Sequence, residues 1–415
     1  MACIDNLTDT AVQASAERNI SLYPWYQAAT GFLPWMPVFF LYFSATVSLQ
    51  QAIELGAIYY FAVVLFEVPS GYLSDRIGRR TTLLLAATFA IASYCTFIIA
   101  SAFPMFAIGQ VLLAGAIAFQ SGSDNSLLYD SLVASKREQE YTALEAQAQK
   151  YSMISLAVSV LIGGALGSIN LKFAYMAALA AAMITWMLCS RFTEPVRVDS
   201  SETQAFLPQL KTAISAAKNP VLAWVLIFYI VGYSLQHIPY EFYQPYIALL
   251  QSHSDSHLFH NQHAAMVSGV VIGLSMFGGA LGASVSERLS KRFGARNVLL
   301  AGLSIQCLII GIMALLLHPA ILLIIVFRNF SMALTHAPMH ALIAPRVKSA
   351  QRATYLSLQS LAGRFAFSMM LLIIAGRAEQ TLTWPALSTI FKTSIALGLV
   401  ALVSLVISSK VIQNE

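Results

Sequence analysis

The fold of this chain is decided by the stretch Glu67-Val-Pro-Ser-Gly71-Tyr-Leu-Ser-Asp75-Arg76-Ile-Gly78-Arg79-Arg80. One apolar segment, near 51–72, runs into it, and another follows near 81–101. A helix of about 20 apolar residues crosses the ~30 Å hydrocarbon layer of a bilayer. The stretch is therefore predicted to be a turn between two membrane helices, in which Gly71 permits close helix approach and Gly78 permits a tight turn.

The charges of this turn are complementary in sign. Asp75 is followed by Arg79 and Arg80, and these side chains are expected to form a charged latch beside the membrane. A basic loop that only marks the cytoplasmic side is the simpler alternative.

The composition of the whole chain favours a membrane protein. Of its 415 residues, 58% are hydrophobic and 10% are charged, and the mean hydropathy is +0.69. Soluble domains carry about 25% charged residues, so this chain has too little polar surface to face water on all sides. The N-terminus lacks the basic start and short apolar core of a signal peptide, and the four cysteines suggest no disulfide framework.

Twelve membrane spans can be placed along the chain. They lie near 20–45, 51–72, 81–101, 104–129, 143–168, 171–190, 221–248, 264–286, 297–317, 319–345, 354–376 and 385–408. The predicted fold class is an all-α polytopic membrane protein with two pseudo-symmetric six-helix bundles. The predicted domains are an N-terminal tail at 1–19, one bundle at 20–190, a linker at 191–219 with an amphipathic segment at 207–217, the second bundle at 220–408 and a tail at 409–415.

The distribution of basic residues predicts the orientation. Most of the 24 Lys and Arg residues fall on the side of both termini. Cytoplasmic loops of membrane proteins carry an excess of Lys and Arg, so both termini are expected in the cytoplasm and the protein in the cytoplasmic (inner) membrane. The lipid bilayer also accounts for the basic composition, and no nucleic-acid partner is needed to explain it.

The spacing Gly-x-x-x-Asp-Arg-x-Gly-Arg-Arg after the second of twelve spans resembles the signature of the major facilitator superfamily (MFS). The resemblance implies that a loop arginine pairs with an acid at the cytoplasmic end of helix four, where Asp130 stands. It also implies alternating access, in which two six-helix bundles rock around a midplane site; we expect a functional monomer. The predicted gating latch comprises Gly71, Asp75, Arg76, Gly78, Arg79, Arg80 and Asp130.

An internal repeat supports this resemblance. Lys291-Arg292-Phe-Gly294-Ala-Arg296 matches the stretch from Asp75 to Arg80 at an offset of 216 residues, since 294 − 78 = 216. Lys291 replaces the aspartate in the second copy, and Glu287 stands where Gly71 was. The latch is therefore expected to be stronger in the N-terminal half.

Charged and aromatic residues inside the spans suggest a substrate site. A charge in the membrane costs at least ~2.5 kcal/mol and usually faces a cavity or a partner. Arg328 and Arg364 lie near mid-membrane, and their charge favours an anionic or carboxylate-bearing solute. The seventh span adds a helical stripe, and the predicted substrate-binding residues are Arg328, Arg364, Tyr233, Gln236, Tyr240 and Glu241. Mutual neutralisation of charges and simple helix packing are the alternatives.

Two carboxylates are candidates for proton coupling. Asp124 lies in the polar run Gln120-Ser-Gly-Ser-Asp124-Asn125-Ser126, and Glu67 lies near the cytoplasmic end of its span. A structural hydrogen-bond role between helices is the equal alternative. His336 with His340, and the loop histidines between 253 and 263, are spaced to bind a metal, but ordinary polar roles fit them better, and no metal or cofactor is expected.

The predicted function is proton-coupled uptake of a small organic solute, a metal chelate or siderophore being one example. Drug exchangers of the resembled superfamily carry a Gly-Pro-rich motif in span five, whereas Leu161-Ile-Gly163-Gly164-Ala-Leu-Gly167 has no proline. Efflux by proton exchange and a non-transporting receptor remain alternatives. The chain has no Walker loop, nucleophile elbow or zincin helix, so an enzyme is not expected.

Overall fold

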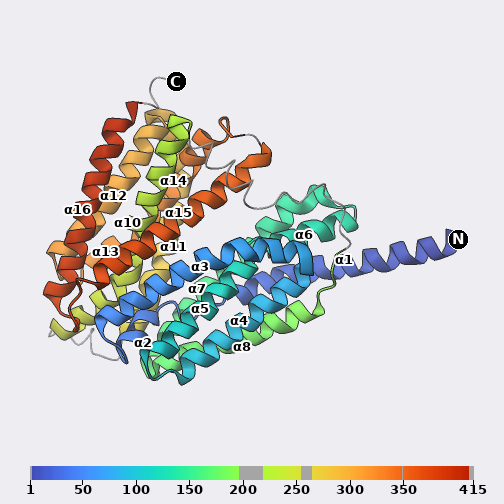
Figure 1. The fold of residues 1–415 in the computed structure, drawn as a ribbon, viewed down its shortest axis with the longest axis horizontal. Coiled ribbons are helices and arrows are strands. Elements are labelled where there is room, and N and C mark those ends of the chain that lie inside the picture. Colours follow the sequence, from blue (N-terminus) through green and yellow to red (C-terminus); the bar gives the residue numbers. More distant parts are fainter. Residues whose placement is uncertain (1, 196–217, 254–263, 348, 411–415) are drawn as a thin grey trace. The chain divides into compact units, whose positions relative to one another are not determined.

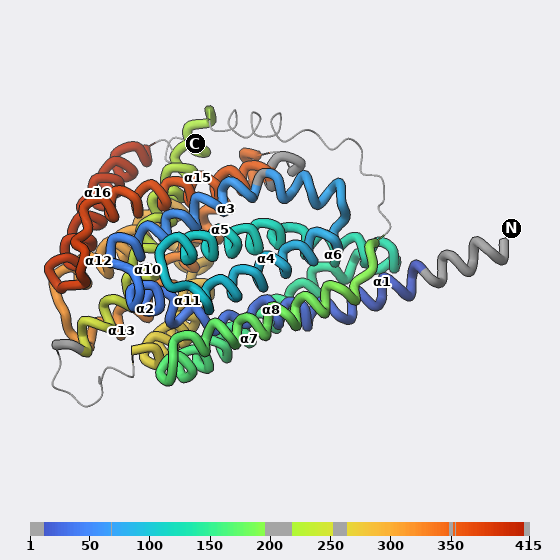
Figure 2. Tube along the Cα trace, turned by 60° about the horizontal axis from the view of Figure 1, so that its bottom comes forward, coloured from blue at the N-terminus to red at the C-terminus, as the bar shows by residue number. Residues whose placement is uncertain are grey.

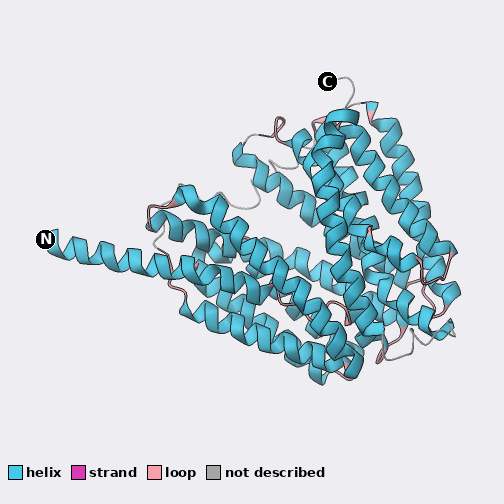
Figure 3. Ribbon diagram, turned by 180° about the vertical axis from the view of Figure 1, so that it is seen from behind, coloured by secondary structure: helices cyan, strands magenta, loops and turns pink. Residues whose placement is uncertain are grey.

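The computed structural model describes residues 2–195, 218–253, 264–347 and 349–410. This part of the chain is built from helices and short loops and contains no strand (Figure 3). Eleven of its helical segments are long and apolar enough to cross a membrane. The predicted fold class is thus confirmed, with eleven such segments where twelve were predicted. The predicted amphipathic segment at 207–217 lies outside the described residues.

The chain forms two compact units. Unit 1 comprises Met1–Met36 and Ala62–Thr203, and unit 2 comprises Pro37–Phe61 and Gln204–Glu415. Unit 1 contains α1 (Ala2–Thr30), the second part of α3 (Leu49–Ile77), α4 (Arg79–Ile99), α5 (Phe103–Gln120), α6 (Ser123–Ala134), the 3-10 helix η1 (Glu138–Glu140), α7 (Tyr141–Ile169) and α8 (Leu171–Arg191). Within it α4 packs against α5 and α8, and α1 packs against α7 (Figures 1 and 2).

Unit 2 begins with α2 (Phe39–Ser44) and the first part of α3. It continues with α10 (Pro220–His253), α11 (Ala264–Phe293), α12 (Ala295–Leu315), α13 (Ile321–Val326), α14 (Arg328–Ile343), α15 (Ser349–Ala375) and α16 (Trp384–Ser408). Helix α14 packs against α10, α11 and α12, and α10 also packs against α15 (Figure 1). This arrangement places α10 and α14, which carry most of the predicted site, side by side.

The first predicted span, 20–45, is wrong as one continuous helix. α1 ends at Thr30 and α2 covers only Phe39–Ser44. Pro34 and Pro37 lie between them, and a proline removes a backbone donor and clashes with the carbonyl four residues before it. The helix is therefore broken at these prolines.

Polar side chains bind the backbone groups freed by this break. In unit 1, the Leu33 N–H donates to Oγ of the buried Ser159 at 3.0 Å. In unit 2, the Phe40 N–H donates to Oε1 of the fully buried Gln244 at 2.9 Å. An unpaired backbone group in lipid costs several kcal/mol, so these side chains make the irregular backbone tolerable.

The broken segment packs closely on α7. A Cβ at Gly163 would collide with the carbonyl oxygen of Pro34. We therefore expect Gly163→Ala to lower the free energy of unfolding by about 1–3 kcal/mol, because overpacking forces the backbone to move. The measurement is the melting temperature of the purified protein in detergent.

Gly232→Ala is the matched control, because no atom of the described residues lies within 4 Å of a Cβ at that helical position. Equal melting temperatures for the Gly163 variant and the wild type would show that α7 does not need this close approach.

Two further spans are interrupted. Gly122, with a φ of +77°, separates α5 from α6 inside the polar run at 120–126. Phe327 separates α13 from α14, immediately before Arg328. Discontinuous helices form the binding sites of many transporters, because their ends present backbone groups to a ligand. Both interruptions lie beside predicted site residues.

The predicted internal repeat is visible in backbone geometry. Gly78 precedes α4 with a φ of +105°, and Gly294 precedes α12 with a φ of +82°. Glycine adopts positive φ without a steric penalty. The equivalent turns after α3 and α11 thus use the same residue for the same reason.

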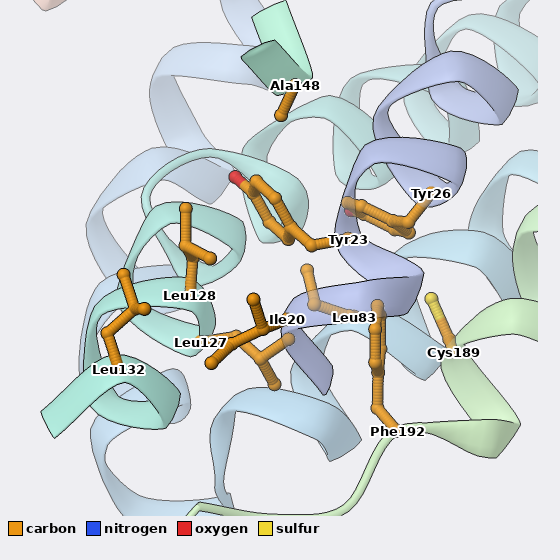
Figure 4. Packing of buried hydrophobic residues seen from close by; sticks show 10 residues of the cluster. All are labelled: Ile20, Tyr23, Tyr26, Leu83, Leu127, Leu128, Leu132, Ala148, Cys189 and Phe192. Atoms are coloured by element: carbon orange, nitrogen blue, oxygen red, sulfur yellow. The ribbon is translucent and has the colours of Figure 1, made fainter. Parts of the chain in front are cut away.

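A cluster of buried side chains holds one end of unit 1 together (Figure 4). Tyr23 and Tyr26 of α1 lie between leucines of α6 and the end of α8, where Cys189 lies and Phe192 directly follows the helix. The full cluster is Ile20, Tyr23, Tyr26, Leu83, Leu127, Leu128, Leu132, Ala148, Cys189 and Phe192. Since lipid tails are as apolar as leucine, close packing rather than escape from water stabilises such a cluster.

Candidate functional site

The strongest site in unit 2 is built around Arg328, the first residue of α14. Its side chain is buried, with 5% of the residue exposed. The guanidinium lies 5.0 Å from the ring centroid of Tyr240 and 5.7 Å from that of Tyr243, both on α10. It has no hydrogen-bond acceptor or ion-pair partner among the described residues. The aromatic rings stabilise the cation and leave its donors available.

Glu241 lies beside this cation on the same helix. Only 6% of the residue is exposed, and the Tyr60 hydroxyl donates to its Oε1 at 3.0 Å. Glu241 and Arg328 interact electrostatically, yet they form no ion pair within 4.0 Å in the described part of the chain. The site thus contains both signs of charge, each held mainly by tyrosines.

The remaining predicted residues of the stripe surround this centre. Tyr233 stacks on His237 with ring centroids 3.9 Å apart. The half-buried Arg364 of α15 interacts electrostatically with Tyr233. Gln236 instead contacts the sulfur of Met332. The structure therefore brings Arg328, Tyr240 and Glu241 together and places the other three at the margin.

Sequence reasoning missed Tyr60, and it placed Tyr243 in the helical stripe of the seventh span without naming it as a substrate-binding residue. Tyr60 comes from α3, which the sequence places five spans before α10. The pair Tyr59-Tyr60 in the middle of a mostly apolar span could have indicated it, but nothing in the sequence linked that pair to Glu241.

A separate polar site lies in unit 1 around Asp124. Gln27 of α1 donates to Oδ2 of Asp124 at 3.1 Å and to the Tyr23 hydroxyl at 2.8 Å. That hydroxyl donates in turn to Oδ1 of Asn125 at 2.9 Å. The network joins α1 to the start of α6 and keeps one carboxylate inside the membrane-spanning part of the unit.

Asp124 also lines a cavity of 340 Å³. The cavity is lined by α1, α4, α5, α6, α7 and α8, and its polar lining includes Gln27, Thr30, Gln120, Ser121, Ser152 and Thr185. Glu67, the other predicted coupling residue, is half-buried on α3 and does not line this cavity. Asp124 and Glu67 are therefore not part of one site.

The predicted latch centres on Arg79. Its guanidinium is 2.7 Å from Oδ1 of Asp75 and 3.5 Å from Oδ2 of Asp130, and it donates to Oγ of Ser74 at 2.9 Å. The side chains of Arg79 and Asp130 are 19% and 25% exposed. The arginine thus joins α3, α4 and α6 in one partly buried network.

The other predicted latch residues contribute less. Arg76 is exposed and donates to the Tyr72 hydroxyl at 3.2 Å. Arg80 donates to the Ser190 carbonyl oxygen at 3.0 Å. Gly71 does not make the predicted close approach, because no described atom lies within 4 Å of a Cβ there. In the second copy, Lys291 has Glu287 as its one ion-pair partner among the described residues, and both side chains are more than three-quarters exposed.

Glu194 contacts the same turn, and sequence reasoning missed it. Its carboxylate accepts the backbone N–H groups of Arg79 at 2.6 Å and Arg80 at 3.0 Å. These groups form the start of α4, where unpaired donors and the helix dipole favour a negative charge. Thr193 beside it exchanges two 2.9 Å bonds with the buried Asn19 side chain. The start of the predicted linker is thereby fixed to α1 and to the α3–α4 turn.

We expect Glu194→Gln to lower the free energy of unfolding by about 0.3–1 kcal/mol, the usual value of a charge at an exposed helix N-terminus. The measurement is the melting temperature at low and high salt, and the loss should shrink as salt rises. Glu138→Gln, which removes another exposed carboxylate of unit 1, serves as control. A salt-independent loss would contradict the electrostatic explanation.

The predicted histidine pair is close in space. The rings of His336 and His340 on α14 lie 4.4 Å apart. Within the described ranges, no group of three or more His, Cys, Asp or Glu side chains gathers as metal ligands do. Of the loop histidines, His257, His260 and His263 lie outside these ranges.

Comparison with known proteins identifies the family. The model of the Major Facilitator Superfamily matches residues 26–371. Among solved structures, a mutant of the nucleoside transporter NupG is similar with a TM-score of 0.80 at 13% identity, over 94% of this chain and 99% of that one.

A peptide transporter POT mutant has a TM-score of 0.70 at 11% identity, over 97% of this chain and 99% of that one. A bacterial homolog to the human lysosomal transporter Spinster has a TM-score of 0.67 at 15% identity, over 96% of each chain. These likenesses show a shared fold. No curated protein matches the sequence. The chain thus belongs to the Major Facilitator Superfamily and is an integral membrane transport protein, not an enzyme.

Proposed function

We propose that this protein is a secondary transporter that takes up a small organic solute carrying a carboxylate or another anionic group. One observation carries the proposal: the buried guanidinium of Arg328 rests against Tyr240 and Tyr243 and has no acceptor among the described residues. A guanidinium binds a carboxylate through two parallel hydrogen bonds. Arg328 is thus the anchor for the anionic end of the solute.

Coupling to protons is part of the proposal. Glu241 lies beside Arg328, and its carboxylate is held by Tyr60. Intramembrane carboxylates near a substrate site commonly carry protons in transporters. Asp124, within the cavity of unit 1, is a second group for this role and Glu67 a third. The solved transporters of similar fold are named for nucleosides and peptides, which supports an organic solute rather than an inorganic ion.

The test is uptake into proteoliposomes with an imposed proton gradient, inside alkaline. We expect the vesicles to accumulate at least one member of a panel of radiolabelled carboxylates. Collapse of the gradient with a protonophore should abolish this accumulation. If accumulation continues in the presence of the protonophore, transport is not coupled to protons. If no anion of the panel accumulates, the proposal that the solute is anionic is wrong.

The cavity around Asp124 favours a second candidate, the exchange of a cationic solute for protons. A carboxylate in a cavity of 340 Å³ suits an organic cation as well as a proton. In the same vesicles with the gradient reversed, inside acidic, accumulation of lipophilic cations that is lost in Asp124→Asn would support exchange over uptake.

A further inference from the structure

The turn between α11 and α12, which is the second copy of the charged turn, has no role in the function proposed above. Helix α11 ends at Phe293 and α12 begins at Ala295 (Figure 1), and each is long and apolar enough to cross a membrane. The turn therefore lies where two spans leave the hydrocarbon layer, at the depth of the lipid head groups.

Basic side chains dominate this turn. They are Arg288, Lys291 and Arg292 near the end of α11 and Arg296 in the first turn of α12. Glu287 is the one acidic residue between positions 287 and 296, and it pairs with Lys291. The segment thus has four positive charges and one negative charge, and its single carboxylate is already paired.

Arg288 and Arg292 are exposed one helical turn apart on α11. Neither forms a hydrogen bond or an ion pair with any described residue. The guanidinium of Arg292 lies 5.2 Å from the ring centroid of Phe293, which is itself exposed. A contact with a ring face leaves the N–H donors of a guanidinium available. The two arginines therefore present unpaired donors at the end of a membrane helix.

The first copy of the turn differs in this respect. Each of its three arginines donates to an acceptor of the protein. Three carboxylates also contact it, those of Asp75, Asp130 and Glu194. The Glu194 carboxylate lies against Gly78, whereas no described atom lies within 4 Å of a Cβ at Gly294. Protein carboxylates thus balance the charge of the first copy, and the described residues supply no such balance in the second.

An exposed apolar stripe of α11 leads to the two arginines. Its members recur every three or four residues, and they are Val270, Leu274, Phe277 and Leu281. Arg288 follows Leu281 by seven residues and Arg292 by eleven, which is about two and three helical turns. The apolar stripe and the arginines therefore lie along the same face of one helix.

We propose that this face of α11 binds an anionic phospholipid, with the phosphate on Arg288 and Arg292 and an acyl chain along the apolar stripe. A guanidinium donates two parallel hydrogen bonds to a phosphate. Basic clusters that directly follow a membrane helix attract anionic head groups. The lipid thus provides in the second copy the negative charge that carboxylates provide in the first.

The experiment measures lipid binding to the full-length protein purified in detergent, by native mass spectrometry over a range of lipid concentrations. The probes are phosphatidylglycerol and phosphatidylcholine with the same acyl chains, and inorganic phosphate, which has the anion without the chains. The variants are Arg288→Gln, Arg292→Gln and the double substitution. Arg76→Gln is the matched control, because it removes an exposed arginine from the first copy of the turn.

We expect the wild type and the Arg76 variant to bind phosphatidylglycerol more tightly than phosphatidylcholine, and the preference to shrink as salt rises. Each single substitution at Arg288 or Arg292 should lower the affinity for phosphatidylglycerol roughly fivefold, the usual effect of one basic residue at a membrane surface. The double substitution should lower it roughly 25-fold. Melting temperatures without added lipid should equal that of the wild type, because neither arginine has an acceptor among the described residues.

Three results would overturn the proposal. They are equal affinity of the wild type for the two lipids, equal affinity of the wild type and the double variant for phosphatidylglycerol, and binding of inorganic phosphate as tight as that of the lipid. A loss in the Arg76 variant as large as in the single variants would contradict the difference between the two turns.

The proposal does not depend on Arg328. Arg328→Ala should retain the preference for phosphatidylglycerol while it loses uptake of the anionic solute, so failure of one proposal can be told from failure of the other.

Discussion

Arg328→Ala should abolish uptake of an anionic solute in proteoliposomes. The guanidinium is buried and available, and removal of one partner from a buried charge-assisted pair costs about 2–5 kcal/mol. That loss corresponds to roughly a 30- to 5,000-fold fall in affinity. Initial uptake rates over a range of solute concentrations provide the measurement.

Lys392→Ala is the control for Arg328. It also removes a cation from a membrane-spanning helix, but the Lys392 side chain is exposed on α16, so uptake should be unchanged. Arg328→Lys should recover only part of the affinity, because an ammonium cannot form the two parallel bonds of a guanidinium. Full uptake activity of Arg328→Ala would show that Arg328 does not bind the solute. Arg364 would then be the remaining predicted cation for binding an anion.

Arg79→Ala should impair transport strongly while the protein remains folded. The substitution leaves Asp75 and Asp130 beside each other without their shared cation. Loss of a partner for a partly buried polar group costs about 1–3 kcal/mol. If the latch stabilises one conformation of the transport cycle, that conformation becomes roughly 5- to 150-fold less populated. Uptake rates should be compared at equal amounts of monodisperse protein.

Arg76→Ala is the matched control in the same turn. Arg76 is exposed and contacts only the Tyr72 hydroxyl among the described residues, so this variant should transport normally. Asp75→Asn should resemble Arg79→Ala, whereas Lys291→Ala should have little effect because its pair with Glu287 is exposed. Equal defects in the Arg76 and Arg79 variants would indicate general loop damage instead of a latch.

The candidate sites were only partly predictable. Arg328, Tyr240 and Glu241 were predicted because charges and aromatic groups inside apolar segments are rare and expensive. Tyr60 and Glu194 were not, because each contacts a residue more than 100 positions away in the sequence.

The sequence by itself determined the membrane fold, the repeat and the charged turn, because these depend on apolar length, glycine and charge at short spacing. Tertiary structure decided what each element does. It broke the first predicted helix at its prolines, with Ser159 and Gln244 binding the freed backbone groups. Among the seven predicted latch residues, it places Arg79 at the centre of a network with Asp75 and Asp130. Glu194, which the sequence did not indicate, binds the backbone N–H of the same arginine. Contacts between distant helices depend on packing, and short-range sequence patterns do not record them.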